Sequence, residues 1–148
     1  MPNNIDEFMR EAIELGRKSI SESGIPIGSV LMRGGSIVGR GHNRRVQNGD
    51  PTAHGEIDCL RNAGRQPTYR DTVIYSTLMP CAMCAGAIVQ FGIAKVVAGE
   101  NRTFHSSAQL MRDHGVEVVD WDLDECFDLL KQFRDKYPDI WNEDIGVQ

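Results

Sequence analysis

Short β-branched segments alternate with amphipathic helical segments along the chain, and this alternation limits the possible folds more than any other feature. Apolar residues at steps of three and four over residues 5–22 predict a helix that closes near Gly24. Residues 27–32 and 36–41 flank an Arg-Gly-Gly turn and predict a β-hairpin. The polar, turn-rich residues 42–53 predict a loop.

The remainder of the chain continues the alternation. Further strands are predicted at residues 72–77, 95–99 and 116–119, and further helices at 54–63, 80–91, 106–113 and 122–137. The order α-β-β-α-β-α-β-α-β-α is typical of an α/β protein whose largely parallel five-stranded sheet lies between two helix layers. The 148 residues suit one domain spanning residues 1–148.

Charge and cysteine usage restrict the class of protein. The chain has 16 Lys and Arg against 21 Asp and Glu, a net charge of −5, which argues against long nucleic acid as a partner. The N-terminus lacks a secretory signal, and no apolar run approaches the roughly 20 residues that span a membrane. A cytoplasmic protein without a membrane partner is therefore expected, in which the four cysteines are available for metal or redox chemistry rather than disulfides.

Two short segments carry metal-ligand chemistry. The first is His54-Gly55-Glu56, and the second is Pro80-Cys81-Ala82-Met83-Cys84. Cys81 and Cys84 are spaced to lie one turn apart on a helix that Pro80 starts, and a helix N-terminus favours the thiolate, which is the metal-binding form. With His54 they make three zinc ligands, which leave the fourth tetrahedral position open as in catalytic sites.

Glu56 is predicted to be the catalytic proton carrier. Two residues after His54, it lies beside the open position without ligating the metal, so it can move a proton from the activated water to a substrate nitrogen. The pattern H-x-E followed by P-C-x-x-C is typical of zinc-dependent nucleobase deaminases. One alternative is a structural zinc site or interaction module, which needs a fourth ligand.

The other cysteines and histidines are candidates for that fourth ligand. Cys59 and Cys126 fall on apolar faces of predicted helices and are expected to be core residues. His42, His105 and His114 fall in polar surroundings and are expected at the surface.

The chain resembles the cytidine-deaminase-like superfamily, and within it most resembles the small free-base cytosine deaminases of the fungal type. The resemblance runs nearly end to end, and the tail Trp-x-Glu-Asp-Ile-Gly is its discriminating segment. The segments that carry it are residues 25–28, 39–43, 54–57, 80–88, 97–101 and 141–146. It implies a three-layer α/β/α sandwich with a central five-stranded mixed sheet, and a homodimer with one zinc ion per subunit. The implied reaction converts cytosine to uracil and ammonia, as in pyrimidine salvage.

The resemblance also implies roles for individual residues. Asn43 would hydrogen-bond the pyrimidine edge, and Asp144 would accept from the base. The remaining implied contacts are the covering aromatic residues Phe104 and Trp141, the pocket residue Ile27, and the backbone at Gly55 and Met79. The tail would act as a lid, so that deletion of residues 139–148 would abolish turnover while leaving the fold and zinc content largely intact.

Two departures from the fungal pattern bear on the substrate. Val46 replaces a pocket aromatic residue, and the loss of that ring suggests a wider pocket. Met79 replaces a small polar residue, but the implied contact there is through the backbone, so cytosine binding can be retained. Isocytosine, a methylated cytosine or guanine then become alternative substrates. A further alternative is a tRNA adenosine deaminase, for which the available basic residues are Arg40, Arg44, Arg45, Arg61, Arg65 and Arg70.

Overall fold

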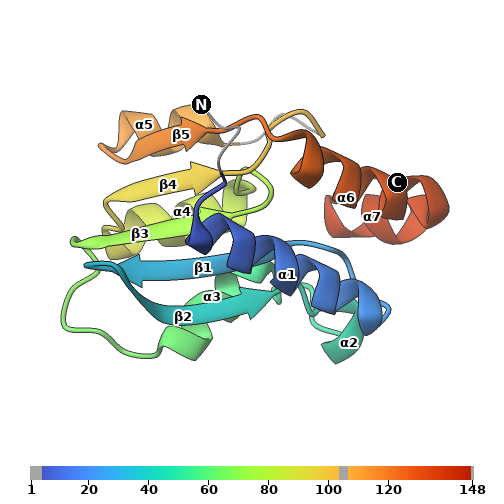
Figure 1. Cartoon of the computed structure of the whole chain (residues 1–148), viewed down its shortest axis with the longest axis horizontal. Coiled ribbons are helices and arrows are strands. Elements are labelled where there is room, and N and C mark those ends of the chain that lie inside the picture. Colours follow the sequence, from blue (N-terminus) through green and yellow to red (C-terminus); the bar gives the residue numbers. More distant parts are fainter. Residues whose placement is uncertain (1–4, 104–106, 148) are drawn as a thin grey trace.

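A five-stranded sheet with strand order β2-β1-β3-β4-β5 forms the middle of the molecule (Figure 1). The computed structural model describes residues 5–103 and 107–147. The strands are β1 (Gly28–Arg33), β2 (Ser36–His42), β3 (Thr72–Ser76), β4 (Lys95–Ala98) and β5 (Glu117–Asp120). The helices are α1 (Glu7–Ser21), α2 (Arg45–Asn48), α3 (Gly55–Ala63), α4 (Ala82–Phe91), α5 (Ala108–Asp113), α6 (Asp124–Lys136) and α7 (Pro138–Asp144).

The sheet is mixed. β1 pairs antiparallel with both β2 and β3, whereas the β3–β4 and β4–β5 pairs are parallel. The mixed sheet expected from the family resemblance is confirmed. The largely parallel sheet expected from element order is wrong for half of it, because the hairpin places the reversed strand β1 beside β3.

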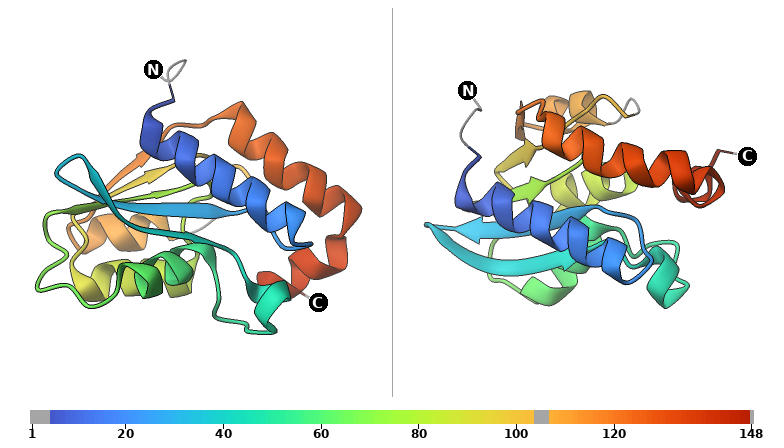
Figure 2. Two further views of the ribbon diagram at one scale, coloured as in Figure 1. Left: turned by 60° about the horizontal axis from the view of Figure 1, so that its bottom comes forward. Right: turned by 45° about the vertical axis from the view of Figure 1, so that its right-hand side comes forward.

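Helices cover both faces of the sheet, as the two views in Figure 2 show. On one face α1 and α6 enclose a core cluster built around Met9, Ile13 and Tyr75. On the other face α3, α4 and α5 enclose a cluster that includes Ile74 and Met111. The predicted three-layer α/β/α architecture is confirmed.

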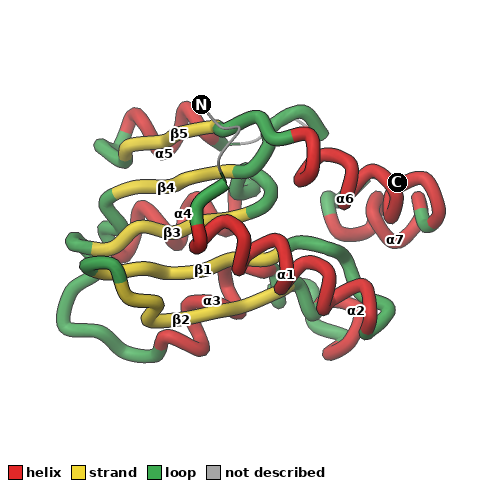
Figure 3. The backbone as a smooth tube through the Cα atoms, in the orientation of Figure 1, coloured by secondary structure: helices red, strands yellow, loops and turns green. Residues whose placement is uncertain are grey.

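Two short helices lie in segments that the sequence pattern did not assign to helix (Figure 3). The helix α2 occupies part of the predicted loop 42–53, and α7 occupies the predicted lid segment. In addition, α4 begins at Ala82, so that Cys81 is its N-cap residue rather than part of its first turn.

The strand directions bring the starts of α3 and α4 to one edge of the sheet. Because β2 and β3 are each antiparallel to β1, they run in the same direction and end at the same edge. His42 at the end of β2 pairs with Gly28, and Thr77 after β3 donates its N–H to the Gly28 carbonyl at 3.0 Å. The segments that follow β2 and β3 therefore lead into α3 and α4 from neighbouring positions.

The C-terminal helix α7 belongs to the core as well as to the surface. Trp141 is 6% exposed and lies in a third cluster with Ile25, Leu78 and Phe133. Deletion of residues 139–148 would remove this buried indole, so we expect the deletion to destabilise the chain. The sequence-based expectation of an intact fold after this deletion does not agree with the packing.

Glycines on β2 set how closely α3 approaches the sheet. A Cβ added at Gly41 would overlap the backbone of Asp58 and Cys59, and one added at Gly39 would approach the Cys59 carbonyl to 2.8 Å. The absence of side chains at these two positions lets α3 lie directly on β2.

Substitution of Gly41 tests this packing. We expect Gly41→Ala to lower the free energy of unfolding by about 1–3 kcal/mol, because the added methyl group overpacks an interface made of backbone. Gly86 on α4 has open space around its Cα, so Gly86→Ala is the control and should leave stability unchanged or slightly higher. Urea denaturation measures both; equal midpoints for Gly41→Ala and the wild type would contradict the packing argument.

Candidate active site

His54, Cys81 and Cys84 come together at this edge of the sheet. His54 is the N-cap residue of α3, Cys81 is the N-cap residue of α4, and Cys84 lies in the first turn of α4. Their ligand atoms lie within 4.8 Å of one another, and this is the group of potential metal ligands found among the described residues. The three residues that the sequence proposed as zinc ligands are thus neighbours in space.

The spacing of the three ligand atoms fits zinc. The His54 Nδ1 atom lies 3.4 Å from the Cys81 Sγ atom and 3.7 Å from the Cys84 Sγ atom. Zn–N and Zn–S bonds of about 2.0 and 2.3 Å at a tetrahedral angle require an N···S separation of about 3.5 Å. One imidazole and two thiolates are also the donor types that zinc prefers.

The two thiols share a proton unequally. The Cys84 thiol donates to Cys81, and this interaction, with His54 beside it, lowers the pKa of Cys81 to about 4 in spite of burial. The pKa of Cys84 is raised well above its ordinary value by the same interaction and by burial. Cys81 is therefore a thiolate at neutral pH, and metal binding must displace the proton held by Cys84.

The imidazole of His54 lies between the cysteines and the C-terminal tail. Burial lowers its pKa, but Asp144 and Cys81 outweigh burial and raise the pKa to about 10. Its Nε2 atom is 3.1 Å from the Asp144 Oδ1 atom. A carboxylate at this position is the usual partner of a zinc-ligating histidine, because it orients the ring while the other nitrogen binds the metal.

Glu56 is buried beside these ligands. Its side chain lies in the first turn of α3 with the residue 4% exposed, and it lines a cavity at the sheet edge. Burial, followed by the negative charge of Cys81, raises the pKa of the Glu56 carboxyl to about 7. A carboxyl that gains and loses a proton near neutral pH suits general acid–base chemistry.

A cavity of about 310 Å³ opens onto Glu56 and His54. This volume is at the small end of the range of about 300–1,000 Å³ typical of small-molecule sites. Four of the residues predicted to contact substrate line it, namely Ile27, Met79, Trp141 and Asp144. Asn43 and Gly55 are not among the lining residues but are adjacent to Ile27. Phe104 lies outside the described residues.

Two buried polar atoms near the cavity lack a hydrogen-bond partner among the described residues. They are the Asn43 Nδ2 donor and the Asp144 Oδ1 acceptor, whose approach to His54 falls short of hydrogen-bond geometry. Asn43 is fully buried and the Asp144 side chain is 3% exposed. The Asp144 carboxylate is compensated by His54, whereas the Asn43 Nδ2 donor is not. Since an unpaired buried polar group is costly, the Asn43 donor indicates a ligand that supplies an acceptor.

The predictions for residues outside the metal group had mixed outcomes. Cys59 and Cys126 are core residues, 0% and 2% exposed, as expected. His114 is exposed as expected, and His105 lies outside the described residues. His42 is 1% exposed, so its predicted surface location is wrong: its Nε2 atom lies 2.8 Å from the Glu22 Oε1 atom under the end of α1.

Val46 does not border the cavity. It is 38% exposed and faces a separate groove with Ile20 and Tyr137. The predicted widening of the pocket at this position is therefore wrong, because α2 turns the Val46 side chain outward. Of the two departures from the fungal pattern, only Met79 lies at the cavity.

Sequence reasoning missed the polar residues that surround Asn43. Asp58 accepts hydrogen bonds from the backbone N–H of His42 and from the Nε atom of Arg44. The one signal available was the spacing of Asp58 on α3, four residues after His54 on a helix that the metal motif had already located.

The fold and the site together define a zinc-dependent hydrolytic deaminase. The family model for the cytidine and deoxycytidylate deaminase zinc-binding region matches residues 2–100, and the chain belongs to this family. The match includes His54, Glu56, Cys81 and Cys84.

Relatives extend the similarity beyond the metal motif. The chain is 46% identical over 141 residues to cytosine deaminase of Candida albicans, covering 93% of this chain and 94% of the relative. It is 36% identical over 144 residues to the tRNA-specific adenosine deaminase of Haemophilus influenzae, covering 88% and 83%. A structure from a study of A-to-I editing by tRNA:A34 deaminases superposes with a TM-score of 0.76 at 28% identity, covering 83% of this chain and 98% of that one.

Removal of zinc is expected to expose one reactive thiol. After treatment with a chelator, iodoacetamide at pH 7 should modify Cys81 first, because its pKa is about 4 and its side chain is partly exposed. Burial raises the pKa of Cys59, and raises that of Cys126 to about 12, so both should stay unmodified.

Mass spectrometry of tryptic peptides measures the modification, and circular dichroism confirms that the chelated protein remains folded. The zinc-loaded protein is the control and should resist modification at Cys81. Equal labelling of Cys126 and Cys81 in folded, chelated protein would contradict this account.

Proposed function

We propose that the protein deaminates a free nucleobase, converting cytosine to uracil with release of ammonia. The observation that carries this proposal is the 46% identity to a cytosine deaminase over nearly the whole length of both chains. The small cavity beside Glu56, with Trp141 and Ile145 of the tail segment in its wall, supports a substrate no larger than a base.

The Asn43 amide and the Asp144 carboxylate match the hydrogen-bonding groups of cytosine. The ring carbonyl and ring nitrogen of cytosine accept hydrogen bonds, and its exocyclic amino group donates them. We assign the Asn43 Nδ2 atom as donor to the pyrimidine edge and the Asp144 Oδ1 atom as acceptor from the amino group. Such polar pairing gives strong discrimination, because a base with the wrong pattern leaves both groups unpaired.

The remaining wall contacts are assigned by shape. Trp141 and Ile27 bring apolar surface to the cavity, against which a planar ring can stack or pack. The backbones of Gly55 and Met79 are assigned to the polar groups of the base, as the fungal resemblance implies; Met79 lines the cavity and Gly55 is adjacent to Ile27. The covering role of Phe104, which lies outside the described residues, stays a prediction.

Glu56 is assigned as the catalytic proton carrier. Zinc held by His54, Cys81 and Cys84 would supply hydroxide near neutral pH by lowering the pKa of a coordinated water. Glu56 would carry the two protons of the attacking water in turn, the first to the ring nitrogen and the second to the departing amino group. Water adds to the ring carbon that carries the amino group, the carbon–nitrogen bond breaks, and uracil and ammonia are the balanced products.

The tRNA alternative rests on basic residues that are already paired. Arg40 lies 3.0 Å from Glu11, and Arg44 lies 2.9 Å from Asp58. Arg45 contacts Glu143 at 3.3 Å, and Arg61 contacts Asp50 at 3.6 Å. These four arginines therefore add little positive potential for a phosphate backbone, which favours a free base over tRNA as the substrate.

The structural-zinc alternative lacks a fourth ligand among the described residues. Cys59 is buried against the Gly39 carbonyl, which lies 3.5 Å from its Sγ atom, and Cys126 packs between α6 and the sheet. Three ligands beside a cavity favour a catalytic site instead.

The cellular setting remains a proposal. We propose one zinc ion per subunit, a homodimer, a cytoplasmic location and a place in pyrimidine salvage, all as the fungal resemblance implies. Within the described residues, no helix has the length and apolar character needed to cross a bilayer. Exposed apolar residues on α4 and α5, among them Phe91 and Leu110, offer a surface for a second subunit.

Glu56→Gln tests the proton transfer. We expect kcat to fall by at least about 10²-fold, since general acid–base catalysis contributes that much or more, while one zinc ion per chain remains bound. Steady-state kinetics and metal analysis measure the two quantities. The matched control is Glu117→Gln on the exposed edge of β5, which should keep full activity. Retained turnover in zinc-loaded Glu56→Gln protein would refute the assigned role.

A panel of substrates tests the base. We expect ammonia release from cytosine, a weaker reaction with methylated cytosine, and none with cytidine, because the tail and Trp141 leave no room for the ribose. Isocytosine and guanine test the alternatives that Met79 leaves open. Turnover of tRNA adenosine in preference to cytosine, with a steep salt dependence of binding, would overturn the free-base proposal.

A further inference from the structure

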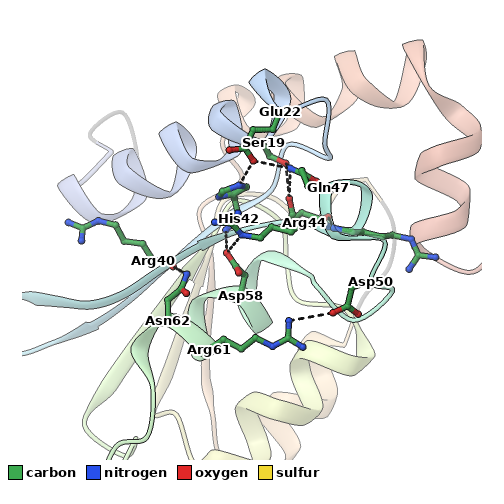
Figure 4. A network of polar contacts seen from close by, with 12 residues as sticks. Ser19, Glu22, Arg40, His42, Arg44, Gln47, Asp50, Asp58, Arg61 and Asn62 are labelled. Atoms are coloured by element: carbon green, nitrogen blue, oxygen red, sulfur yellow. Dashed lines mark hydrogen bonds and ion pairs between the residues drawn. The ribbon is translucent and has the colours of Figure 1, made fainter.

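The two residues that flank Asn43 are both held by one carboxylate. The Asp58 Oδ2 atom accepts from the backbone N–H of His42 at 3.1 Å and from the Nε atom of Arg44 at 2.9 Å (Figure 4). Asp58 is 6% exposed and lies on α3, two residues after Glu56. The segment that carries Asn43 is therefore tied directly to the helix that carries Glu56 and follows His54.

The other polar atoms of Asn43 are also held. Its N–H donates to the Ile27 carbonyl at 2.9 Å, and its side-chain Oδ1 atom accepts from the Arg45 N–H at 2.9 Å. Its carbonyl accepts from the Ser19 Oγ atom at 2.8 Å and from the Gln47 Nε2 atom at 3.2 Å. Only the Nδ2 atom lacks a partner among the described residues, so the amide has one defined orientation.

A carboxylate buried for stability alone would be a poor choice at position 58. Desolvation of the charge offsets much of what its two charge-assisted hydrogen bonds contribute, so a well-packed apolar residue could serve stability as well. What the carboxylate adds is geometry, because it fixes the backbone on one side of Asn43 and the side chain on the other.

We propose that Asp58, acting through His42 and Arg44, is a positioning residue that sets the Asn43 amide relative to Glu56. This inference rests on the proposed role of Asn43 in binding the base. The Asp58 side chain does not line the cavity, and its hydrogen bonds go to His42 and Arg44 rather than to a proposed metal ligand. Only its backbone N–H contacts His54, donating to the His54 carbonyl at 2.9 Å within α3. Its effect on the reaction is exerted on substrate binding, because small displacements of a binding group are enough to lose its hydrogen bond.

A double-mutant cycle tests the proposal. Asp58→Ala should raise KM for cytosine about 3- to 10-fold, the range of one neutral hydrogen bond, with kcat within about twofold and zinc content unchanged. In the Asn43→Ala background the same substitution should raise KM no further, because the group it positions is gone. Asp58→Asn, which keeps an acceptor oxygen, should recover part of the loss.

Two further variants keep the test decisive. Arg44→Met removes one donor to Asp58 without leaving a backbone N–H unpaired, and it should raise KM in the same way even if Asp58→Ala folds poorly. Glu11→Gln breaks the ion pair between α1 and Arg40, which does not involve the Asn43 segment, and it is the matched control. It should leave KM and kcat unchanged.

The outcomes separate the two claims. The positioning role would be overturned if Asp58→Ala raised KM by the same factor in the Asn43→Ala background as in the wild type. It would also be overturned if KM were unchanged in both Asp58→Ala and Arg44→Met. In either case the function of Asn43 stands. A fall in kcat and zinc content without a change in KM would show that Asp58 is structural and would also overturn it. If Asn43→Ala alone leaves KM unchanged, the assigned role of Asn43 fails first and the positioning role fails with it.

Discussion

The site depends on two helices that begin at the same edge of one sheet. α3 and α4 each begin there because the reversed strand β1 makes β2 and β3 run in the same direction. Each helix start directs unpaired N–H groups and a partial positive charge toward the shared point. A histidine, two cysteines and a glutamate at those starts meet in a region that favours negative charge. The low pKa of Cys81 comes from the Cys84 thiol, from His54 and from the backbone N–H of Cys84 in the first turn of α4. The proposed metal ligands and proton carrier are thus positioned by backbone topology.

Binding and stability share the same residues at the C-terminus. Trp141 contributes to the third core cluster and also to the cavity wall, and Asp144 lies on the next turn beside His54. The contact between Arg45 and Glu143 joins α7 to the segment that carries Asn43. The tail is therefore an integral wall of the site, and opening it for substrate exchange would cost core contacts as well as polar ones.

The sequence predicted what depends on local pattern and missed what depends on tertiary pairing. The strands, and the clustering of His54, Cys81 and Cys84 beside Glu56, were predicted because residue spacing and β-branched runs are local properties. The direction of β1, the burial of His42 and the outward orientation of Val46 were not, because each is decided by a partner distant in the chain. The bridge from Arg44 to Asp58 spans 14 positions and looks from sequence like two ordinary surface charges. Polar residues gain structural roles through such distant partners, and the periodicity of the sequence does not predict these pairs.

The charge pattern of the cavity argues for a neutral substrate. Among the described residues that line it there is no lysine or arginine, and both Glu56 and Asp144 contribute carboxyl groups. A phosphate group in this position would meet like charge in a poorly solvated space, where such repulsion is weakly screened. In the proposed mode of binding, a neutral base would instead meet an amide donor at Asn43 and a carboxylate acceptor at Asp144. This arrangement would disfavour a nucleotide and hold a small aminated ring beside Glu56. Selectivity for the free base would then depend both on the lack of lysine and arginine among the described lining residues and on the hydrogen bonds proposed for the base.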